Sequence, residues 1–138
     1  MRINSEVPWS VNYTSRVTIP EKIKIGIDVS KSFVLSGSCY IQGGNGIEIG
    51  DYTIFAPGVK IISSNHNSEI SNSEWIKRKP IKIGKYCWIG ANAIILPEVE
   101  LGDYTVVGAG TVITKNFPEG FVVIAGNPAR LIRYLKND

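Results

Sequence analysis

The sequence is poor in the residues that mark several common protein classes. It holds two cysteines, one histidine and one methionine in 138 residues. Two cysteines do not make the disulfide framework of a small secreted domain. The longest wholly apolar run, residues 121–125, is far too short to cross a bilayer, and the N-terminus has no apolar segment of signal-peptide length. We therefore expect no membrane span and a cytoplasmic location.

A large charge excess is also missing. Lys and Arg together number 15 against 12 for Asp and Glu, which gives a formal net charge of +3. This small surplus suits an anionic small molecule, but without a basic cluster it gives no reason to expect nucleic acid as a partner. The chain length fits one domain with a continuous core, so we expect a single domain over residues 1–138.

What the sequence does contain is a repeat of six residues between Ile83 and Pro118. Each block opens with an aliphatic residue, and glycine follows it in four of the six blocks. The fifth place is small or β-branched in the first five blocks. The opening residues are Ile83, Ile89, Ile95, Leu101, Val107 and Ile113, and the fifth places are Cys87, Ala93, Val99, Thr105 and Thr111. Repetition at a fixed period indicates a repeat architecture.

A period of six fits neither an amphipathic helix nor an alternating strand. It fits a coil of short flat strands joined by tight corners, with three blocks in each triangular turn. The opening aliphatic residue points inward and stacks on its counterpart in the next coil, and glycine permits the corner dihedrals. Each coil buries its apolar row only against its neighbours. The pattern predicts an all-β protein, a parallel β-helix of about five coils.

The rest of the chain suggests how this β-helix begins, breaks and ends. Residues 1–18 carry no repeat and are expected to form an N-terminal cap, with the β-helix over 19–126. The spacing of 34 residues from Ile49 to Ile83 is not a multiple of six, so a loop at about 67–80 must leave the coil. Asn127 and Pro128 suit the start of a helix, which predicts a short C-terminal α-helix over 127–138.

His66 is the only histidine of the chain, and it ends a block directly before the predicted loop. A lone histidine can be a hydrogen-bonded structural residue. A histidine at an edge of the prism, beside a loop that forms a cleft, can also accept a proton from a hydroxyl near neutral pH. Both interpretations stand on the residues alone.

Three stretches carry a resemblance to a known family: ISSNH with its loop, residues 80–118, and VVIAGNPARLIR. In these the chain resembles the hexapeptide-repeat acyltransferases with a left-handed β-helix, close to maltose, galactoside and nodulation-type sugar O-acetyltransferases. The resemblance implies a homotrimer with active sites between subunits. It also implies transfer of an acetyl group from acetyl-CoA to a hydroxyl of a sugar or surface-polysaccharide precursor, without a metal. His66 matches the catalytic base of the family.

The resemblance also implies sites for both substrates. For CoA, Ala91 and Ala109 match positions where backbone lines the pantetheine arm. Thr114 and Lys115 match a pair near the nucleotide, and Arg130 and Arg133 match two cations near the phosphates. A solvated basic face is the other interpretation of the lysine and the arginines. On the acceptor side, Ser36 falls on an acceptor-contacting position of the family, and Trp88 on a wall of the cleft, where packing is the alternative. Asn65 is a further substrate-side candidate, to orient His66 or to stabilise the oxyanion.

Other functions share this fold or its chemistry. A γ-class carbonic anhydrase needs three histidines for its zinc, which a chain with one histidine cannot supply. Serine acetyltransferase is disfavoured because its large helical N-terminal domain has no counterpart here. The helical N-terminal segment of the maltose and galactoside enzymes is also missing. An N-acyltransferase acting on an amino-sugar nucleotide would use the same base and CoA, and a non-catalytic β-helix scaffold would bind no CoA. These two alternatives stay open.

Overall fold

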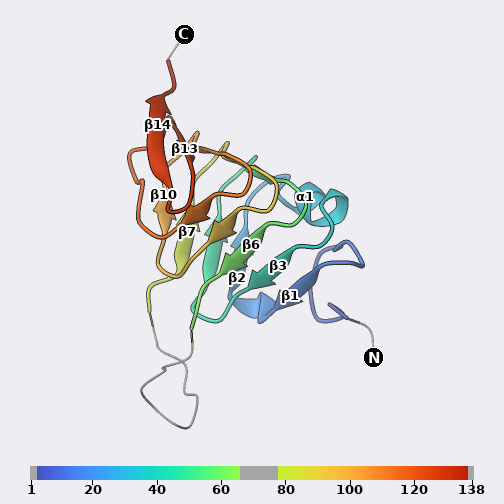
Figure 1. Ribbon diagram of the computed structural model, residues 1–138. Coiled ribbons are helices and arrows are strands. Elements are labelled where there is room, and N and C mark those ends of the chain that lie inside the picture. Colours follow the sequence, from blue (N-terminus) through green and yellow to red (C-terminus); the bar gives the residue numbers. More distant parts are fainter. Residues whose placement is uncertain (1–2, 66–77, 137–138) are drawn as a thin grey trace.

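The computed structural model describes residues 3–65 and 78–136. Its strands stack in register into three sheets along one axis, with β1 near one end and β14 at the other (Figure 1). Sheet A contains β1 (Arg16–Thr18), β3 (Tyr40–Gln42), β6 (Lys60–Ile62), β9 (Ile94–Ile95) and β12 (Val112–Ile113). Sheet B contains β2 (Ile23–Ile25), β4 (Ile47–Ile49), β7 (Ile81–Ile83) and β10 (Glu100–Leu101). Sheet C contains β5 (Ile54–Phe55), β8 (Trp88–Ile89), β11 (Val106–Val107), β13 (Val122–Ala125) and β14 (Arg130–Tyr134).

The chain runs from sheet B to sheet C to sheet A and back, one strand per sheet in each full coil. We call the turns between them the B–C, C–A and A–B corners. The six aliphatic residues that open the blocks are all buried, none more than 3% exposed, and their counterparts pair in register, as Ile49 does with Ile83 and Ile89 with Val107. The residues at the fifth place are buried as well. The predicted parallel β-helix is confirmed.

The reason for the glycines differs from the one expected. Gly84 and the other glycines at the second place of a block do not have positive φ. The left-handed conformation falls instead on the fourth place, where Tyr86 has φ 55° and Asn92 has φ 60°. A Cβ on Gly84 would lie 2.6 Å from the backbone nitrogen of Asp103 in the next coil. Glycine is therefore required because adjacent coils approach too closely for a side chain, and not by the corner dihedrals.

A short helix replaces a strand at the N-terminal end. After η1 (Pro20–Lys22) and β2, the helix α1 (Ser30–Leu35) occupies the place that strands of sheet C occupy in later coils. Its Phe33 packs edge-on against Phe55, with ring centroids 5.0 Å apart, and against Trp9, at 5.2 Å. Trp9 of the N-terminal segment thus packs at the aromatic end of the core. The helix itself was not expected, because the repeat is only blurred between Ser30 and Asn45.

The predicted C-terminal α-helix is wrong. Residues 130–134 form β14, which pairs antiparallel with β13 at the end of sheet C. Strand pairing satisfies the outer edge of β13, whereas a short helix would leave that edge open. Leu131 and Ile132, which suggested a helical stripe, are exposed on this last strand.

Both thiols belong to the core. Cys39 and Cys87 are free and buried, and burial raises the pKa of each thiol above its ordinary value.

Most of the predicted loop at 67–80 falls outside the described residues. Within the described part of the chain, no helix is long and apolar enough to cross a membrane.

Candidate functional site

A pocket of about 320 Å³ lies at the A–B corner, where the chain leaves sheet A. Its lining comes from three successive coils, because β6, β9 and β12 are neighbours in sheet A. The corner that follows each strand therefore stacks on the next. The lining residues are Asn65, Arg78, Leu96, Pro97, Glu98 and Thr114. We call this cavity the A–B pocket.

The A–B pocket brings together two residues that the sequence analysis assigned to different substrates. Asn65 was expected on the acceptor side and Thr114 on the nucleotide side, and both line this cavity. Among the described residues the Asn65 side chain is exposed and makes no hydrogen bond, so its amide is free to contact a ligand. His66 follows Asn65 directly in the chain but lies outside the described residues.

A buried polar network fixes the chain as it approaches the A–B pocket. The side-chain oxygen of Gln42 accepts hydrogen bonds from the backbone N–H groups of Ser63 (3.2 Å) and Ser64 (3.0 Å). The hydroxyl of Ser63 donates to the carbonyl of Gln42 (2.7 Å), and the backbone N–H of Asn45 donates to that hydroxyl (3.0 Å). Gln42 is 6% exposed, so these bonds form away from water and hold residues 63–64 in one conformation.

An oppositely charged pair, Arg78 and Glu98, lines the A–B pocket. The Arg78 guanidinium lies 3.9 Å from a carboxylate oxygen of Glu98, and both side chains are partly exposed. The backbone N–H of Lys79 donates to the other oxygen of Glu98 (3.3 Å). Lys115, one residue after Thr114, places its ammonium 5.5 Å from the centre of the Phe117 ring. An anionic ligand in the pocket would meet the guanidinium of Arg78, in competition with Glu98.

Three other predicted CoA residues lie near the opposite end of sheet A. Ala91 and Ala109 occupy the C–A corner in successive coils, where the N–H of Gly110 donates to the carbonyl of Ala91 (2.8 Å). Arg130 pairs with Ala125, the last residue of β13, which ends at the C–A side of sheet C in the next coil. Five of the six expected CoA residues therefore form two groups in one chain, with sheet A between them: Ala91, Ala109 and Arg130 near the C–A corner, and Thr114 and Lys115 at the A–B corner. Arg133 pairs with Val123 and lies further from the C–A corner along β14.

A β-bulge aligns the two arginines of β14. Arg133 pairs with Val123 and Leu131 with Ile124, so Ile132 is an extra residue on this strand. Paired residues project from the same side of a sheet. Arg130, opposite Ala125, and Arg133, opposite Val123, therefore both project from the outer face of sheet C. Regular alternation would have put residues three apart on opposite faces.

Two residues expected on the acceptor side lie away from the A–B pocket. Trp88 is 57% exposed on the outer face of sheet C, in register with Val106 and, through it, Val123. Ser36 is 5% exposed and its hydroxyl donates to the carbonyl of Phe55 (2.6 Å). Ser36 is thus engaged inside the fold, and we do not include it in the site.

Two further residues of this region were not among those expected in the site. Arg78 had a signal in the sequence, because it lies at the centre of the basic run at 77–79 beside the predicted loop. Gln42 had no such signal, because a buried glutamine differs from a surface one only through its partners. Among residues 3–65 and 78–136, no group of three or more His, Cys, Asp or Glu side chains is placed to hold a metal ion.

Comparison with known proteins defines the class. The family model for the bacterial transferase hexapeptide (six repeats) matches residues 80–115, within the stretch that shows the six-residue period. The fold and this match identify the chain as a left-handed parallel β-helix protein built from transferase hexapeptide repeats.

Within that class, the chain is similar to sugar O-acetyltransferases. It is 34% identical over 113 residues to galactoside O-acetyltransferase of Escherichia coli K12, a match that covers 80% of this chain and 55% of that one. A maltose O-acetyltransferase from Clostridium difficile 630 has a TM-score of 0.75 at 32% identity, covering 89% of this chain and 64% of that chain. A galactoside acetyltransferase in complex with coenzyme A has a TM-score of 0.78 at 31% identity, covering 93% and 62%. The chain spans less than two thirds of the length of each of these relatives.

Proposed function

We propose that this protein is an acetyl-CoA-dependent O-acetyltransferase that modifies a hydroxyl of a sugar or surface-polysaccharide precursor. The observation that carries the proposal is the A–B pocket, in which Asn65 and Thr114 meet beside the segment that leads to His66. The similarity to galactoside and maltose O-acetyltransferases supports the same chemistry. Acetyl-CoA is a cytoplasmic metabolite, so the proposal includes that location.

In the proposed reaction, His66 is the general base. It takes the proton of the acceptor hydroxyl while the hydroxyl oxygen attacks the thioester carbonyl of acetyl-CoA. The C–S bond then breaks, the CoA sulfur accepts the proton from the imidazolium, and the acetyl ester leaves. The exposed amide of Asn65 offers a donor to the acceptor or to the oxyanion. No step requires a metal.

Acetyl-CoA binding is assigned to the two groups at the ends of sheet A. We propose that Thr114 and Lys115 contact the nucleotide, and that Arg130 and Arg133 contact phosphates. Ala91 and Ala109 offer backbone at a corner with little side-chain bulk, which suits the pantetheine arm. Trp88 stands on the same side of the molecule as the two arginines, and we keep it as an outer wall of this region.

The separation of these groups supports a shared site between subunits. In one chain the corner with Ala109 and the corner with Thr114 lie at opposite ends of sheet A. A homotrimer with a three-fold axis beside sheet A would set the C–A corner of one subunit against the A–B corner of the next. One CoA could then touch both groups. Sedimentation equilibrium tests this part of the proposal, since a monomer at concentrations that support turnover would contradict it.

The test of the function is release of free thiol from acetyl-CoA with a panel of acceptors: free sugars, nucleotide-linked sugars and their amino-sugar counterparts. The proposal predicts thiol release that depends on a hydroxyl acceptor. Preference for an amine would assign the protein to the N-acyltransferases instead. No release with any acceptor, together with no CoA binding by calorimetry, would leave a scaffold without catalysis.

A further inference from the structure

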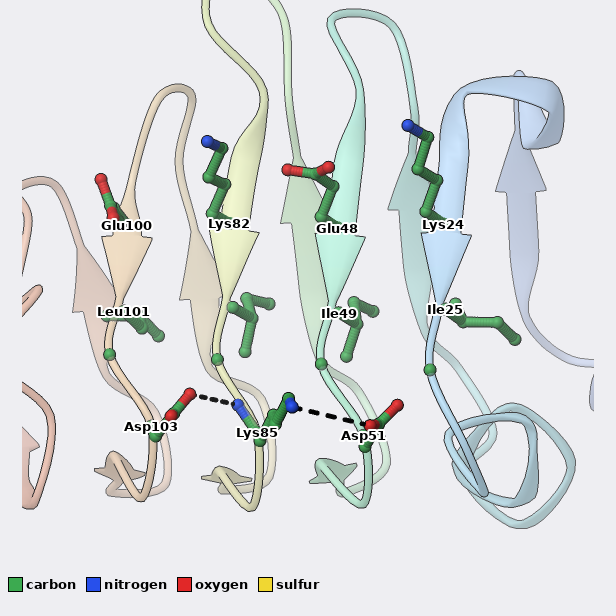
Figure 2. A pocket seen from close by; sticks show the side chains of 15 residues that line it. Lys24, Ile25, Glu48, Ile49, Asp51, Lys82, Lys85, Glu100, Leu101 and Asp103 are labelled. Carbon is green, nitrogen blue, oxygen red and sulfur yellow. Dashed lines mark hydrogen bonds and ion pairs between the residues drawn. The ribbon is translucent and has the colours of Figure 1, made fainter.

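Sheet B carries a row of charged side chains that alternate in sign. Lys24, Glu48, Lys82 and Glu100 are paired in register across β2, β4, β7 and β10. Their strand neighbours Ile47, Ile49, Ile81 and Ile83 are buried, so the charged residues project outward. Figure 2 shows the four charged side chains next to one another on one face of sheet B. We call these four residues the charged row.

A second row repeats the signs of the first in three of the four coils, and the counterpart of Lys24 in this row is the uncharged Ile27. Three residues along the chain, Asp51 follows Glu48, Lys85 follows Lys82 and Asp103 follows Glu100 (Figure 2). A shallow groove of about 470 Å³ runs between the rows, and the glycines at the second place of each block contribute to its lining. Successive coils therefore present bands of positive, negative, positive and negative charge around one groove.

These charges are not fully used within the chain. In the second row, the ammonium of Lys85 lies 3.9 Å from a carboxylate oxygen of Asp51, and the backbone N–H of Lys85 donates to a carboxylate oxygen of Asp103 (2.8 Å). Among the described residues, no member of the charged row forms an ion pair within 4.0 Å. The row thus keeps its capacity for partners outside the chain.

We propose that sheet B is a contact surface for a second copy of this chain, arranged with the two coil axes antiparallel. The order of signs is positive, negative, positive, negative, and reversing it gives the opposite sign at every place. A two-fold axis along the strands reverses the coil order, so Lys24 faces Glu100 and Glu48 faces Lys82, twice each. A two-fold axis along the coil stack would set every residue against itself and bring like charges together.

The size of the face sets the strength of the contact. Four strands at a spacing of about 4.8 Å, with their corners, offer about 350 Å² per partner. A stable complex buries about 800 Å² per partner. The contact is therefore weak and depends on ionic strength, because its charges stay near solvent. It is independent of the proposed trimer, whose contacts involve the corners of sheet A.

Single charge reversals give a direct test by sedimentation velocity. At low ionic strength, the sedimentation coefficient of the wild type rises with concentration, and added salt removes the rise. Lys82→Glu and Glu48→Lys each associate at least about tenfold more weakly, because like charges then meet at two places. A mixture of the two variants restores association, since each row is complementary to the other in the antiparallel arrangement.

Two controls separate this contact from other effects of charge. Lys136→Glu makes the same charge change away from sheet B and leaves association unchanged. The double variant Glu48→Lys/Lys82→Glu keeps the net charge and still matches itself under the antiparallel two-fold axis, although neighbouring charges within the chain now repel. It therefore associates like the wild type even if its melting temperature falls.

Three results would overturn the proposal: no concentration-dependent association of the wild type at low ionic strength, mixed variants that stay apart, or a double variant that does not associate. Circular dichroism of each variant shows whether it is folded, and the mixture experiment uses only variants that are.

Discussion

The side-chain oxygen of Gln42 lies 3.0 Å from the backbone nitrogen of Ser64 and 3.1 Å from the Ser64 hydroxyl. This one acceptor holds the turn that ends at the A–B pocket. We expect Gln42→Leu to leave the buried N–H of Ser64 without a partner, whereas the N–H of Ser63 keeps its bond to the backbone carbonyl of residue 42 (3.2 Å). The expected cost is about 1–3 kcal/mol of unfolding free energy. Urea denaturation measures this cost.

The same variant also tests the link from this turn to the proposed chemistry. If the turn positions the segment before His66, the turnover number of folded Gln42→Leu falls by about tenfold or more. Ser64→Ala is the matched control, because it removes only the hydroxyl and leaves both backbone bonds to Gln42. Equal losses in the two variants, or full turnover in Gln42→Leu, would count against the positioning role.

Close approach between coils predicts strong intolerance at Gly84. An alanine Cβ there would lie 2.6 Å from the backbone nitrogen of Asp103, and neither coil can move without disturbing its neighbours. We expect Gly84→Ala to cost about 3 kcal/mol or more, as other severe steric changes in packed cores do.

Gly110 is the comparison position for Gly84. It has φ +70°, but an alanine Cβ at this position would have nothing within 4 Å, so Gly110→Ala suffers backbone strain alone. That strain is about 1 kcal/mol. Thermal melting compares the stability of Gly84→Ala with that of Gly110→Ala. A larger fall in melting temperature for Gly110→Ala would contradict the packing argument.

A column of stacked rings runs along the B–C corner. Tyr86 lies between Tyr52 and Tyr104, with both centroid distances 5.0 Å and interplanar angles of 22° and 12°. Tyr86→Ala removes two stacking contacts, and we expect a loss of about 1–3 kcal/mol. Tyr13, which is 90% exposed, provides the control, and Tyr13→Ala should leave the melting temperature unchanged. A neutral effect at Tyr86 would show that the column does not stabilise the fold.

The buried thiols predict a pH dependence at the alkaline end. Desolvation raises the pKa of Cys39 and of Cys87 in the folded chain, so the folded state keeps its thiol protons where the unfolded state loses them. Their contribution to stability is complete below the ordinary thiol pKa and is lost as the pH rises from there through the raised pKa.

Replacing both cysteines tests that dependence. Cys39→Ala/Cys87→Ala should flatten the alkaline fall in unfolding free energy, although it lowers stability at neutral pH by creating small cavities. In the wild type, a thiol reagent should label neither cysteine rapidly until the chain unfolds. Rapid labelling of the folded wild type at neutral pH would contradict the burial of both thiols.

The six-residue period was sufficient to predict the β-helix and its inward residues, because burial at every sixth place leaves a direct mark on the sequence. The C-terminal strand was not predictable in the same way. Leu131 and Ile132 suit a helix by spacing, but the open edge of β13 determines what residues 130–134 become. That edge exists only in the folded structure. The role of the block glycines was also hidden, since close approach depends on the neighbouring coil.

The candidate site was predictable only in part. Thr114 was identified through a family resemblance and Asn65 as a candidate partner of the reaction, and both line one pocket. Ser36 was assigned to the acceptor side by the same resemblance, yet its hydroxyl is bonded to the carbonyl of Phe55 inside the fold. A motif gives a position along the chain, whereas availability to a ligand depends on burial and partners. The hydrogen bonds of Gln42 could not be inferred for that reason.

The most direct test of the proposed function compares thiol release from acetyl-CoA by the wild type and by His66→Ala, with a hydroxyl acceptor that the wild type uses. Calorimetry on both proteins establishes that CoA binding is retained. We predict a fall in turnover of about a hundredfold or more in His66→Ala with CoA affinity unchanged, as removal of a general base requires. Equal turnover by the two proteins would contradict the assignment of His66 as the base.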